Sequence, residues 1–291
     1  MPYIKEVCMA GRTIEIRKYY SVRYHSQGIP RAEREKPTGE RLKAANRRKA
    51  ERDLTRLLNA NFEDGDYWVR LDFHKEKPSG SVEMQEMTAR AFRKLRTLYR
   101  KQGLTLKYVY CKEIGPKGSR HIHAVISKGD LALLQKAWTY GGIHVDPLYT
   151  EGQYRRIAQY MVKYSEKTEE TEGTLIGKRW YGSRSLTKPK ITKTKIPAKE
   201  FRAAPSIPKS LRRKGYQLEK GSEHGSISEW TGYPFYAYTL IRYDKEERDA
   251  GEHLHLPDAP GQQKKRRRSL RPRGDLGSVE EPGDEAGDTD L

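Results

Sequence analysis

A short turn in the middle of the chain constrains the fold more than any other feature of the sequence. Gly115-Pro116-Lys117-Gly118 separates two strand-like runs, Leu106 to Ile114 and Arg120 to Ser127. Glycine and proline so close together are typical of a turn, and a turn this short joins strands that run antiparallel. The sequence therefore predicts a β-hairpin at this point.

The segments around this hairpin alternate between strand and helix patterns. Residues Tyr67 to Phe73 are rich in aromatic and β-branched side chains, which favours a strand. Residues Ser81 to Lys101 carry apolar side chains on one helical face. The expected elements that follow the hairpin are a helix over Asp130 to Trp138, a strand over Ile143 to Leu148 and a helix over Gln153 to Lys167. This order predicts an α+β fold with a central antiparallel, RRM- or ferredoxin-like sheet of about five strands, flanked by helices.

The two ends of the chain differ from this central part. A strand or hairpin is expected within Arg12 to Tyr24, and a strongly charged helix from Thr38 to about Asn59. After Gly173 the chain becomes basic and irregular, and an aromatic-rich hairpin is expected between Gly221 and Tyr243. We therefore predict four parts: an N-terminal hairpin and charged helix (1–62), a central core (63–190), a basic linker and aromatic hairpin that complete the domain (191–244), and a disordered tail (245–291).

The charge balance indicates a polyanionic partner. The 291 residues include 58 Lys and Arg against 39 Asp and Glu, and the formal net charge is +19. Nucleic acid is the simplest partner that makes such self-repulsion tolerable, because Lys and Arg neutralise phosphates. No stretch reaches about 18 apolar residues and the first residues lack the apolar run of a signal peptide, so we expect no membrane partner. Two isolated cysteines form neither a zinc pattern nor a disulfide framework, which is typical of a reducing cytoplasm.

The expected tail carries both signs of charge. Lys264 to Arg268 is a basic run, and the residues from Asp275 to the end are acidic and rich in glycine. We interpret the basic run as a flexible tether to the DNA backbone; a nuclear address is the alternative interpretation.

A pair of histidines is the first candidate for chemistry. His121 and His123 are two residues apart in an expected strand, so their side chains lie on the same face of the sheet. At a spacing of about 7 Å, two imidazoles can converge on one metal ion. The alternative is that two neutral, exposed histidines lie side by side by chance.

Glu113 strengthens the metal interpretation. If the central turn forms a hairpin, Glu113 lies across from the neighbourhood of His121. One carboxylate with two imidazoles suits Mg²⁺ or Mn²⁺ assisted by phosphate oxygens better than structural zinc. The alternative for Glu113 is a surface ion pair with Lys112 or Lys117, and His144 is a weaker ligand candidate.

The helix that follows carries two tyrosines in a repeated pattern. Tyr160 and Tyr164 are four residues apart and so lie on one face, and Lys163 and Lys167 each follow a tyrosine by three positions. A phenol with a pKa near 10 is a poor nucleophile, but a nearby cation and a metal-polarised phosphodiester both assist it. The alternative is an amphipathic helix whose tyrosines pack on the sheet while its lysines reach solvent.

Taken together, these segments resemble the HUH endonucleases, the replication initiators and relatives that nick single-stranded DNA. His121-Ile122-His123 matches the family's histidine motif, and Tyr160 to Tyr164 matches its tyrosine motif. Glu113 stands where a third metal ligand is usual. Tyr67 to Phe73 is similar to the first strand motif, although Arg70 and Asp72 depart from its usual Thr-Leu-Thr.

The resemblance extends over roughly Thr38 to Pro189. The paired tyrosines are similar to those of filamentous-phage and microvirus-type initiators, in which both act in turn. Residues 37–62 and 179–186 also resemble bacterial phage- and plasmid-type replication-associated proteins. The chain has no Gly-x-x-x-x-Gly-Lys-Ser/Thr loop, so a fused helicase is not indicated.

The resemblance implies a rolling-circle replication initiator acting in the cytoplasm of a bacterial host. Glu113, His121 and His123 would hold Mg²⁺ or Mn²⁺. Tyr160 would attack the scissile phosphate of single-stranded origin DNA and become linked to the 5′ phosphate, with Lys163 beside it. Tyr164, with Lys167 beside it, would make the second attack. A host polymerase and helicase would then be further partners.

Three other interpretations remain open on the sequence. A conjugative relaxase or a single-strand transposase would use the same site chemistry. A non-catalytic nucleic-acid-binding protein with an RRM-like sheet would bind DNA without cleavage. A metal-binding regulator without nuclease activity would leave the repeated Tyr-x-x-Lys pattern unexplained.

Overall fold

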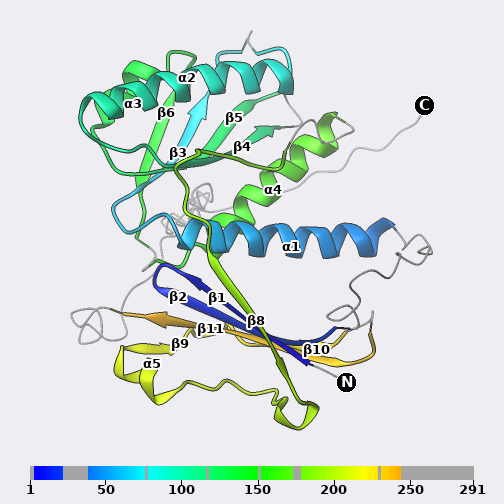
Figure 1. Ribbon diagram of the computed structural model, residues 1–291. Coiled ribbons are helices and arrows are strands. Elements are labelled where there is room, and N and C mark those ends of the chain that lie inside the picture. The colour runs from blue at the N-terminus through cyan, green and yellow to red at the C-terminus, as the bar shows by residue number, and fades with distance from the viewer. Residues whose placement is uncertain are drawn as a thin grey trace, which may run out of the picture. The chain divides into compact units, whose positions relative to one another are not determined.

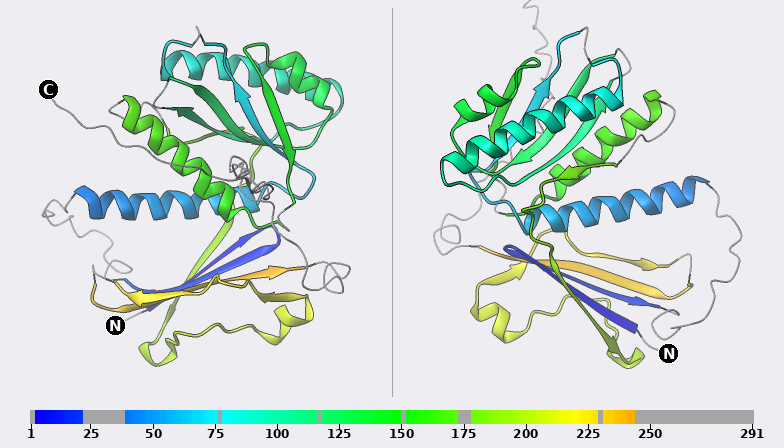
Figure 2. Two further views of the ribbon diagram at one scale, coloured as in Figure 1. Left: turned by 180° about the vertical axis from the view of Figure 1, so that it is seen from behind. Right: turned by 45° about the horizontal axis from the view of Figure 1, so that its top comes forward.

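Two antiparallel sheets and five α-helices make up the part of the chain that the structure describes. The computed structural model describes residues 3–21, 39–75, 78–115, 118–149, 152–172, 178–228 and 231–243. The expected α+β class, with a central antiparallel sheet flanked by helices, is confirmed (Figures 1 and 2). The expected tail and its basic run, Lys264 to Arg268, lie outside the described residues.

A six-stranded sheet, which the sequence did not predict, joins the two ends of the described chain. Its strands follow the order β10-β11-β2-β1-β8, and β9 also pairs with β11. The strands are β1 (Tyr3–Ala10), β2 (Thr13–Tyr20), β8 (Lys190–Ile196), β9 (Tyr216–Leu218), β10 (His224–Ile227) and β11 (Pro234–Arg242). Residues between β8 and β9 form the 3-10 helix η1 (Ala198–Glu200) and the helix α5 (Lys209–Arg213).

The expectation of an irregular chain after Gly173 is therefore wrong for much of residues 190–218. The strand β8 has the sequence KITKTKI, and nearly all of it is exposed. It lacks the apolar alternation that reveals a half-buried strand, and it pairs with β1, which is far away in the sequence. The predicted hairpin between Gly221 and Tyr243 corresponds to β10 and β11.

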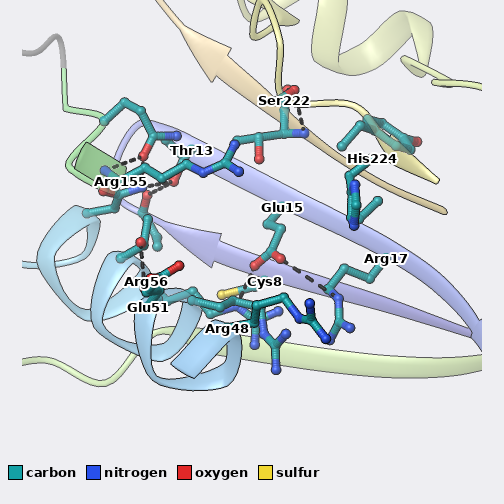
Figure 3. A pocket seen from close by; sticks show the side chains of 18 of the residues that line it. Cys8, Thr13, Glu15, Arg17, Arg48, Glu51, Arg56, Arg155, Ser222 and His224 are labelled. Carbon is teal, nitrogen blue, oxygen red and sulfur yellow. Dashed lines mark hydrogen bonds and ion pairs between the residues drawn. The ribbon is translucent and has the colours of Figure 1, made fainter. Parts of the chain in front are cut away.

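Helix α1 (Gly39–Asn59) is attached to this sheet by buried ion pairs. Arg56 binds Glu6 of β1 at 2.7 Å. It also binds Glu15 of β2, and both of these side chains are labelled in Figure 3. Arg17 and Lys193 lie 3.5 and 3.3 Å from the Glu6 carboxylate. These five residues are called the Arg56 cluster below. Burial alone would raise the pKa of Glu6, but the hydrogen bond and charge of Arg56 outweigh it and lower that pKa to about 2.

The five-stranded sheet has the predicted arrangement. Its order is β6-β3-β5-β4-β7, and all its strand pairs are antiparallel. The strands are β3 (Tyr67–Asp72), β4 (Tyr108–Ile114), β5 (Arg120–Ile126), β6 (Ile143–Pro147) and β7 (Tyr181–Gly182). With α2 (Ser81–Lys101) after β3 and α3 (Leu131–Ala137) after β5, the order is that of a ferredoxin-like unit. The hairpin β4–β5 is closed by the Gly118 amide, which donates to the Gly115 carbonyl at 2.9 Å.

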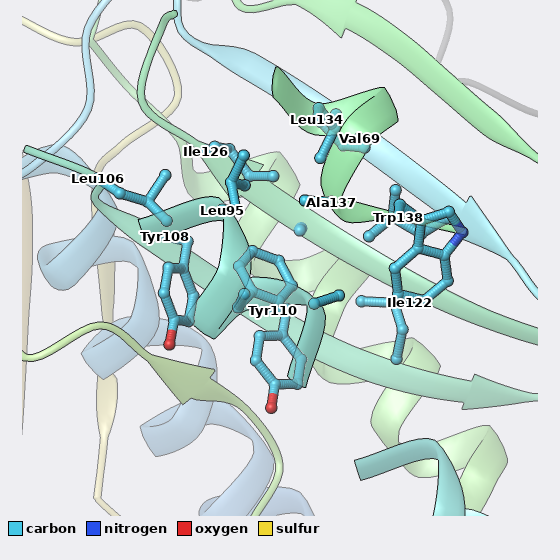
Figure 4. Packing of buried hydrophobic residues seen from close by; sticks show 14 of the residues in the cluster. Val69, Leu95, Leu106, Tyr108, Tyr110, Ile122, Ile126, Leu134, Ala137 and Trp138 are labelled. Atoms are coloured by element: carbon cyan, nitrogen blue, oxygen red, sulfur yellow. The ribbon is translucent and has the colours of Figure 1, made fainter. Parts of the chain in front are cut away.

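One face of the five-stranded sheet is an apolar core under α2 and α3. Alternate strand residues such as Val69, Tyr110 and Ile122 point to this face, where Leu95 and Leu134 of the helices cover them (Figure 4). Because Ile122 points into this core, its neighbours in β5, His121 and His123, point to the opposite face of the sheet.

The opposite face is covered by α4 (Arg155–Glu172) and by part of α1. Leu54 and Leu58 of α1 and Met161 of α4 are fully buried against strand residues that include Val109 and Val125. This second core occupies only part of the face, and the remainder carries polar side chains. No helix within the described ranges is both long and apolar enough to cross a membrane.

Candidate active site

The two histidines lie on the α4 face of the five-stranded sheet, as the sequence predicts. Their ring centroids are 6.4 Å apart. His123 is buried, with a relative exposure of 4%, whereas the His121 side chain is 26% exposed. Period-2 alternation along β5 explains this placement, because Ile122 between them packs into the opposite core.

Glu113 lies directly across from His121 in the β4–β5 register, which confirms the expected alignment. Its carboxylate nevertheless contacts the other histidine: Glu113 Oε2 is 2.7 Å from His123 Nε2. An ionised carboxylate can only accept, so His123 Nε2 carries the proton and Nδ1 keeps a lone pair. That Nδ1 atom is buried and has no hydrogen-bond partner among the residues that the structure describes. Burial lowers the pKa of His123, and this favours the neutral imidazole that metals bind.

Asp72 is a functional candidate that the sequence analysis did not identify. At the end of β3, it pairs with His121 in the β3–β5 register. One carboxylate oxygen is 2.8 Å from His121 Nδ1, and the other is 3.0 Å from His144 Nε2. Arg70 donates to the same carboxylate at 3.0 Å. The hydrogen bond fixes the proton of His121 on Nδ1, so its lone pair is on Nε2.

We call Glu113, His121, His123, Asp72 and His144 the histidine cluster. In the sequence, Asp72 is notable only as a departure from the usual wording of a strand motif, and His144 is only a weak candidate for a metal ligand. The strand order connects them, because β3 lies between β5 and β6 and Asp72 on β3 is thus beside His121 of β5 and His144 of β6. Strand order is a long-range property that local patterns do not contain.

Both tyrosines of α4 reach the histidine side of the sheet. The Tyr164 ring stacks on the His123 ring with centroids 3.9 Å apart and planes 7° from parallel. Tyr160 lies one turn earlier, with its ring edge-to-face against Tyr164 at 5.3 Å. Burial and then the Glu113 charge raise the pKa of Tyr164 above its ordinary value of 10. The helix packs in this orientation because Ala158, Met161 and Val162 on its other positions are fully buried.

The two lysines of the repeated pattern are less well defined. Lys163 lies on α4 and is exposed. Lys167 lies within the same helix, but its side chain is outside what the structure describes. The structure therefore brings together Glu113, His121, His123, Tyr160 and Tyr164, and leaves the lysine assignments as predictions.

The histidine cluster suits a divalent cation by its chemistry. Within the described ranges, no three His, Cys, Asp or Glu side chains are already gathered as a metal-binding group. The donor set nevertheless fits Mg²⁺ or Mn²⁺: each of His121 and His123 gives one N–H to a carboxylate and retains a lone pair, an arrangement common in metal-binding histidines. The buried Nδ1 of His123 is the lone pair that this residue can offer to a cation, and it points away from the Nε2–H that Glu113 accepts, so Glu113 would have to turn from His123 to share that ion.

The central part of the chain matches a known protein family. Residues 66–169, about a third of the chain, match the family model of the replication-associated protein ORF2/G2P. This segment includes the whole histidine cluster and both tyrosines, and it confirms the resemblance to replication initiators. No curated protein and no solved structure matches the chain.

Proposed function

We propose that this chain, whose residues 66–169 match the replication-associated proteins, is a rolling-circle initiator that nicks single-stranded origin DNA through a phosphotyrosine. The observation that carries the proposal is the stacking of Tyr164 on His123, with Tyr160 on the adjoining turn. A helix-borne phenol is thereby next to the carboxylate and imidazoles that suit a cation. A protein that only binds nucleic acid has no need of this juxtaposition.

Glu113, His121 and His123 are the residues that would hold Mg²⁺ or Mn²⁺. When bound, such an ion offsets the charge that develops on a phosphodiester under attack. Asp72 orients His121 by accepting a hydrogen bond from its Nδ1–H group. Glu113 also holds His123 in place through the 2.7 Å contact.

Tyr160 is the proposed first nucleophile. Its phenolic oxygen loses its proton and forms a bond to phosphorus, the bond from phosphorus to the 3′ oxygen breaks, and that oxygen takes up a proton. The products are a 5′ phosphate joined to Tyr160 and a free 3′ hydroxyl that a host polymerase can extend. The phosphotyrosine conserves the energy of the broken bond, which allows later rejoining.

Tyr164 is the proposed second nucleophile. Because it lies beside Tyr160, it can attack a second phosphate without release of the first DNA end. The strand displaced by polymerase and helicase in a bacterial cytoplasm would be closed in this way. Lys163 and Lys167 would neutralise charge near Tyr160 and Tyr164.

The test is formation of a covalent protein–DNA adduct with single-stranded origin DNA and Mn²⁺, followed on a denaturing gel. The wild type should form the adduct and Tyr160→Phe should not. An adduct that persists in Tyr160→Phe contradicts the assignment of the first nucleophile. Metal-dependent nicking that survives alanine at both His121 and His123 contradicts the metal site, and binding without any adduct in the wild type favours a non-catalytic protein.

A further inference from the structure

A second candidate site lies between the six-stranded sheet and helix α1. A cavity of about 510 Å³ opens there, lined by β1, β2, β10, β11, α1 and the start of α4 (Figure 3). The cavity is separate from the histidine cluster, since none of the five cluster residues lines it.

The cavity lining is strongly cationic. Its six cationic residues are Arg17, Arg48, Lys49, Arg52, Arg56 and Arg155. Among the described residues, the only carboxylates that line it are Glu15 and Glu51, and each already binds an arginine: Glu15 binds Arg56, and Glu51 binds Arg47 at 3.0 Å. Lys49 pairs with Asp53, and Arg17 and Arg56 belong to the Arg56 cluster. Among the described residues, Arg48, Arg52 and Arg155 are therefore the lining cations that have no ion pair.

Arg52 is a lining cation with a buried nitrogen that no hydrogen bond satisfies among the described residues. Its Nε atom is buried and has no hydrogen-bond partner within the described part of the chain. Burial and then the charges of Arg17 and Arg56 lower the pKa of its guanidinium. A buried guanidinium nitrogen without a partner destabilises a folded protein, so its presence in a cavity is best explained by an anionic ligand.

We propose that this cavity binds the phosphates of single-stranded DNA, with Arg48 and Arg52 as the principal contacts. A guanidinium matches a phosphate with two parallel hydrogen bonds, and an arginine cannot lose its charge at neutral pH. His224 and Phe235 line the same cavity and stand edge-to-face with centroids 5.3 Å apart. They offer aromatic surface to an unpaired base, and a cationic groove with aromatic side chains is typical of single-strand binding.

The cavity is also well placed to lead a strand to the tyrosines. Gln159 of α4 lines the cavity, and Tyr160 is the next residue. Successive residues on a helix are about 100° apart, so one side of α4 faces the cavity and the adjoining side faces the histidine cluster. A strand held by Arg48 and Arg52 can therefore continue around α4 toward Tyr160. The identity of the nucleic acid rests on the proposed function, whereas the anion site does not.

The test measures binding of a short fluorescent single-stranded oligonucleotide to the full chain in the presence of a chelator, over a range of salt concentrations. Arg48→Ala with Arg52→Ala should weaken binding at least tenfold and reduce the slope of log K against log salt by about 1.4, since each lost phosphate contact removes about 0.7. The matched control is Arg90→Ala with Arg93→Ala, which removes the same charge from exposed positions of α2. Equal effects in the two double variants overturn the proposal.

Two further measurements protect the test against misfolding and against a different ligand. Arg48→Lys with Arg52→Lys keeps both charges but loses the paired hydrogen bonds, so it should bind more tightly than the alanine double variant and more weakly than the wild type; lysines that bind as weakly as alanines overturn the proposal. If the alanine double variant weakens binding of a duplex of the same sequence more than binding of the single strand, the proposal is also overturned. The chelator prevents the metal-dependent nicking, so this experiment measures binding alone. The anion site can therefore be confirmed even if the wild type forms no covalent adduct with Mn²⁺, and it can be overturned even if the adduct forms.

Discussion

The histidine cluster and the Arg56 cluster each contain a buried carboxylate, Glu113 and Glu6, but they are built differently. In the Arg56 cluster every carboxylate meets arginine, which is always protonated, and Glu6 alone is contacted by Arg56, Arg17 and Lys193. In the histidine cluster the carboxylates meet imidazoles, and burial lowers the pKa of His123. In the first set both carboxylates are paired with permanent cations, whereas the second retains nitrogen lone pairs for a metal cation. We infer that the first stabilises the fold and the second performs chemistry.

The largest expected effect is on nicking by Glu113→Gln. The amide has the size of the carboxylate but cannot supply its charge, so we expect adduct formation to slow at least about a thousandfold, which corresponds to about 4 kcal/mol. The melting temperature should change little. The matched control is Glu6→Gln in the Arg56 cluster, which should lower the melting temperature and leave nicking by the folded protein unchanged. The reverse pattern would contradict the division between the two clusters.

The second-largest expected effect is a loss of folding stability in Arg56→Met. Removal of the arginine leaves the Glu6 carboxylate buried with weaker partners, and breaking a buried ion pair from one side typically costs about 3–5 kcal/mol. We expect a loss near 3 kcal/mol, because Arg17 and Lys193 remain near Glu6, and urea unfolding measures it. The double variant with Arg56→Met and Glu6→Gln should lose less stability than the sum of the losses in the two single variants. Additive losses would show that the pair is not coupled.

Acid should weaken the Arg56 cluster in a defined range of pH. The pKa of Glu6 is lowered from 4.5 to about 2 in the folded protein, so its contribution to stability is complete above pH 4.5 and is lost as the pH falls toward 2. The contribution is at most about 3 kcal/mol, because a tenfold change in an acid constant corresponds to about 1.4 kcal/mol. Unfolding of the wild type and of Glu6→Gln should differ above pH 4.5 and converge toward pH 2. A difference that does not depend on pH would contradict this assignment.

The sequence predicted the parts of this molecule that depend on local patterns. The helix Ser81–Lys101 was predicted at its observed bounds, because its apolar face repeats without interruption. The alignment of Glu113 with His121 followed from a single turn, and the shared face of Tyr160 and Tyr164 from helical spacing. Each of these requires only neighbours in the chain.

The remaining features depend on distant partners. The strand β8 is nearly all exposed and forms on β1, more than 180 positions earlier, so its sequence carries no burial pattern. The contact of Glu113 with His123 in place of His121 depends on side-chain conformation within the sheet. Asp72 acquires its role only because β3 is inserted between β5 and β6. Local spacing contains none of these facts.

Asp72→Asn tests the feature of the histidine cluster that the sequence did not reveal, and we expect the smallest effect from it. An amide accepts the Nδ1 proton of His121 less strongly than a carboxylate does, so His121 is oriented less firmly. The Mn²⁺ concentration that gives half-maximal nicking should rise about 10- to 100-fold, as is typical for partners of metal-binding histidines. Asp146→Asn is the matched control, since Asp146 is exposed on β6 opposite Trp68 and contacts no histidine among the described residues. An Mn²⁺ dependence that is unchanged in Asp72→Asn, or equally changed in the control, would mean that Asp72 does not orient His121.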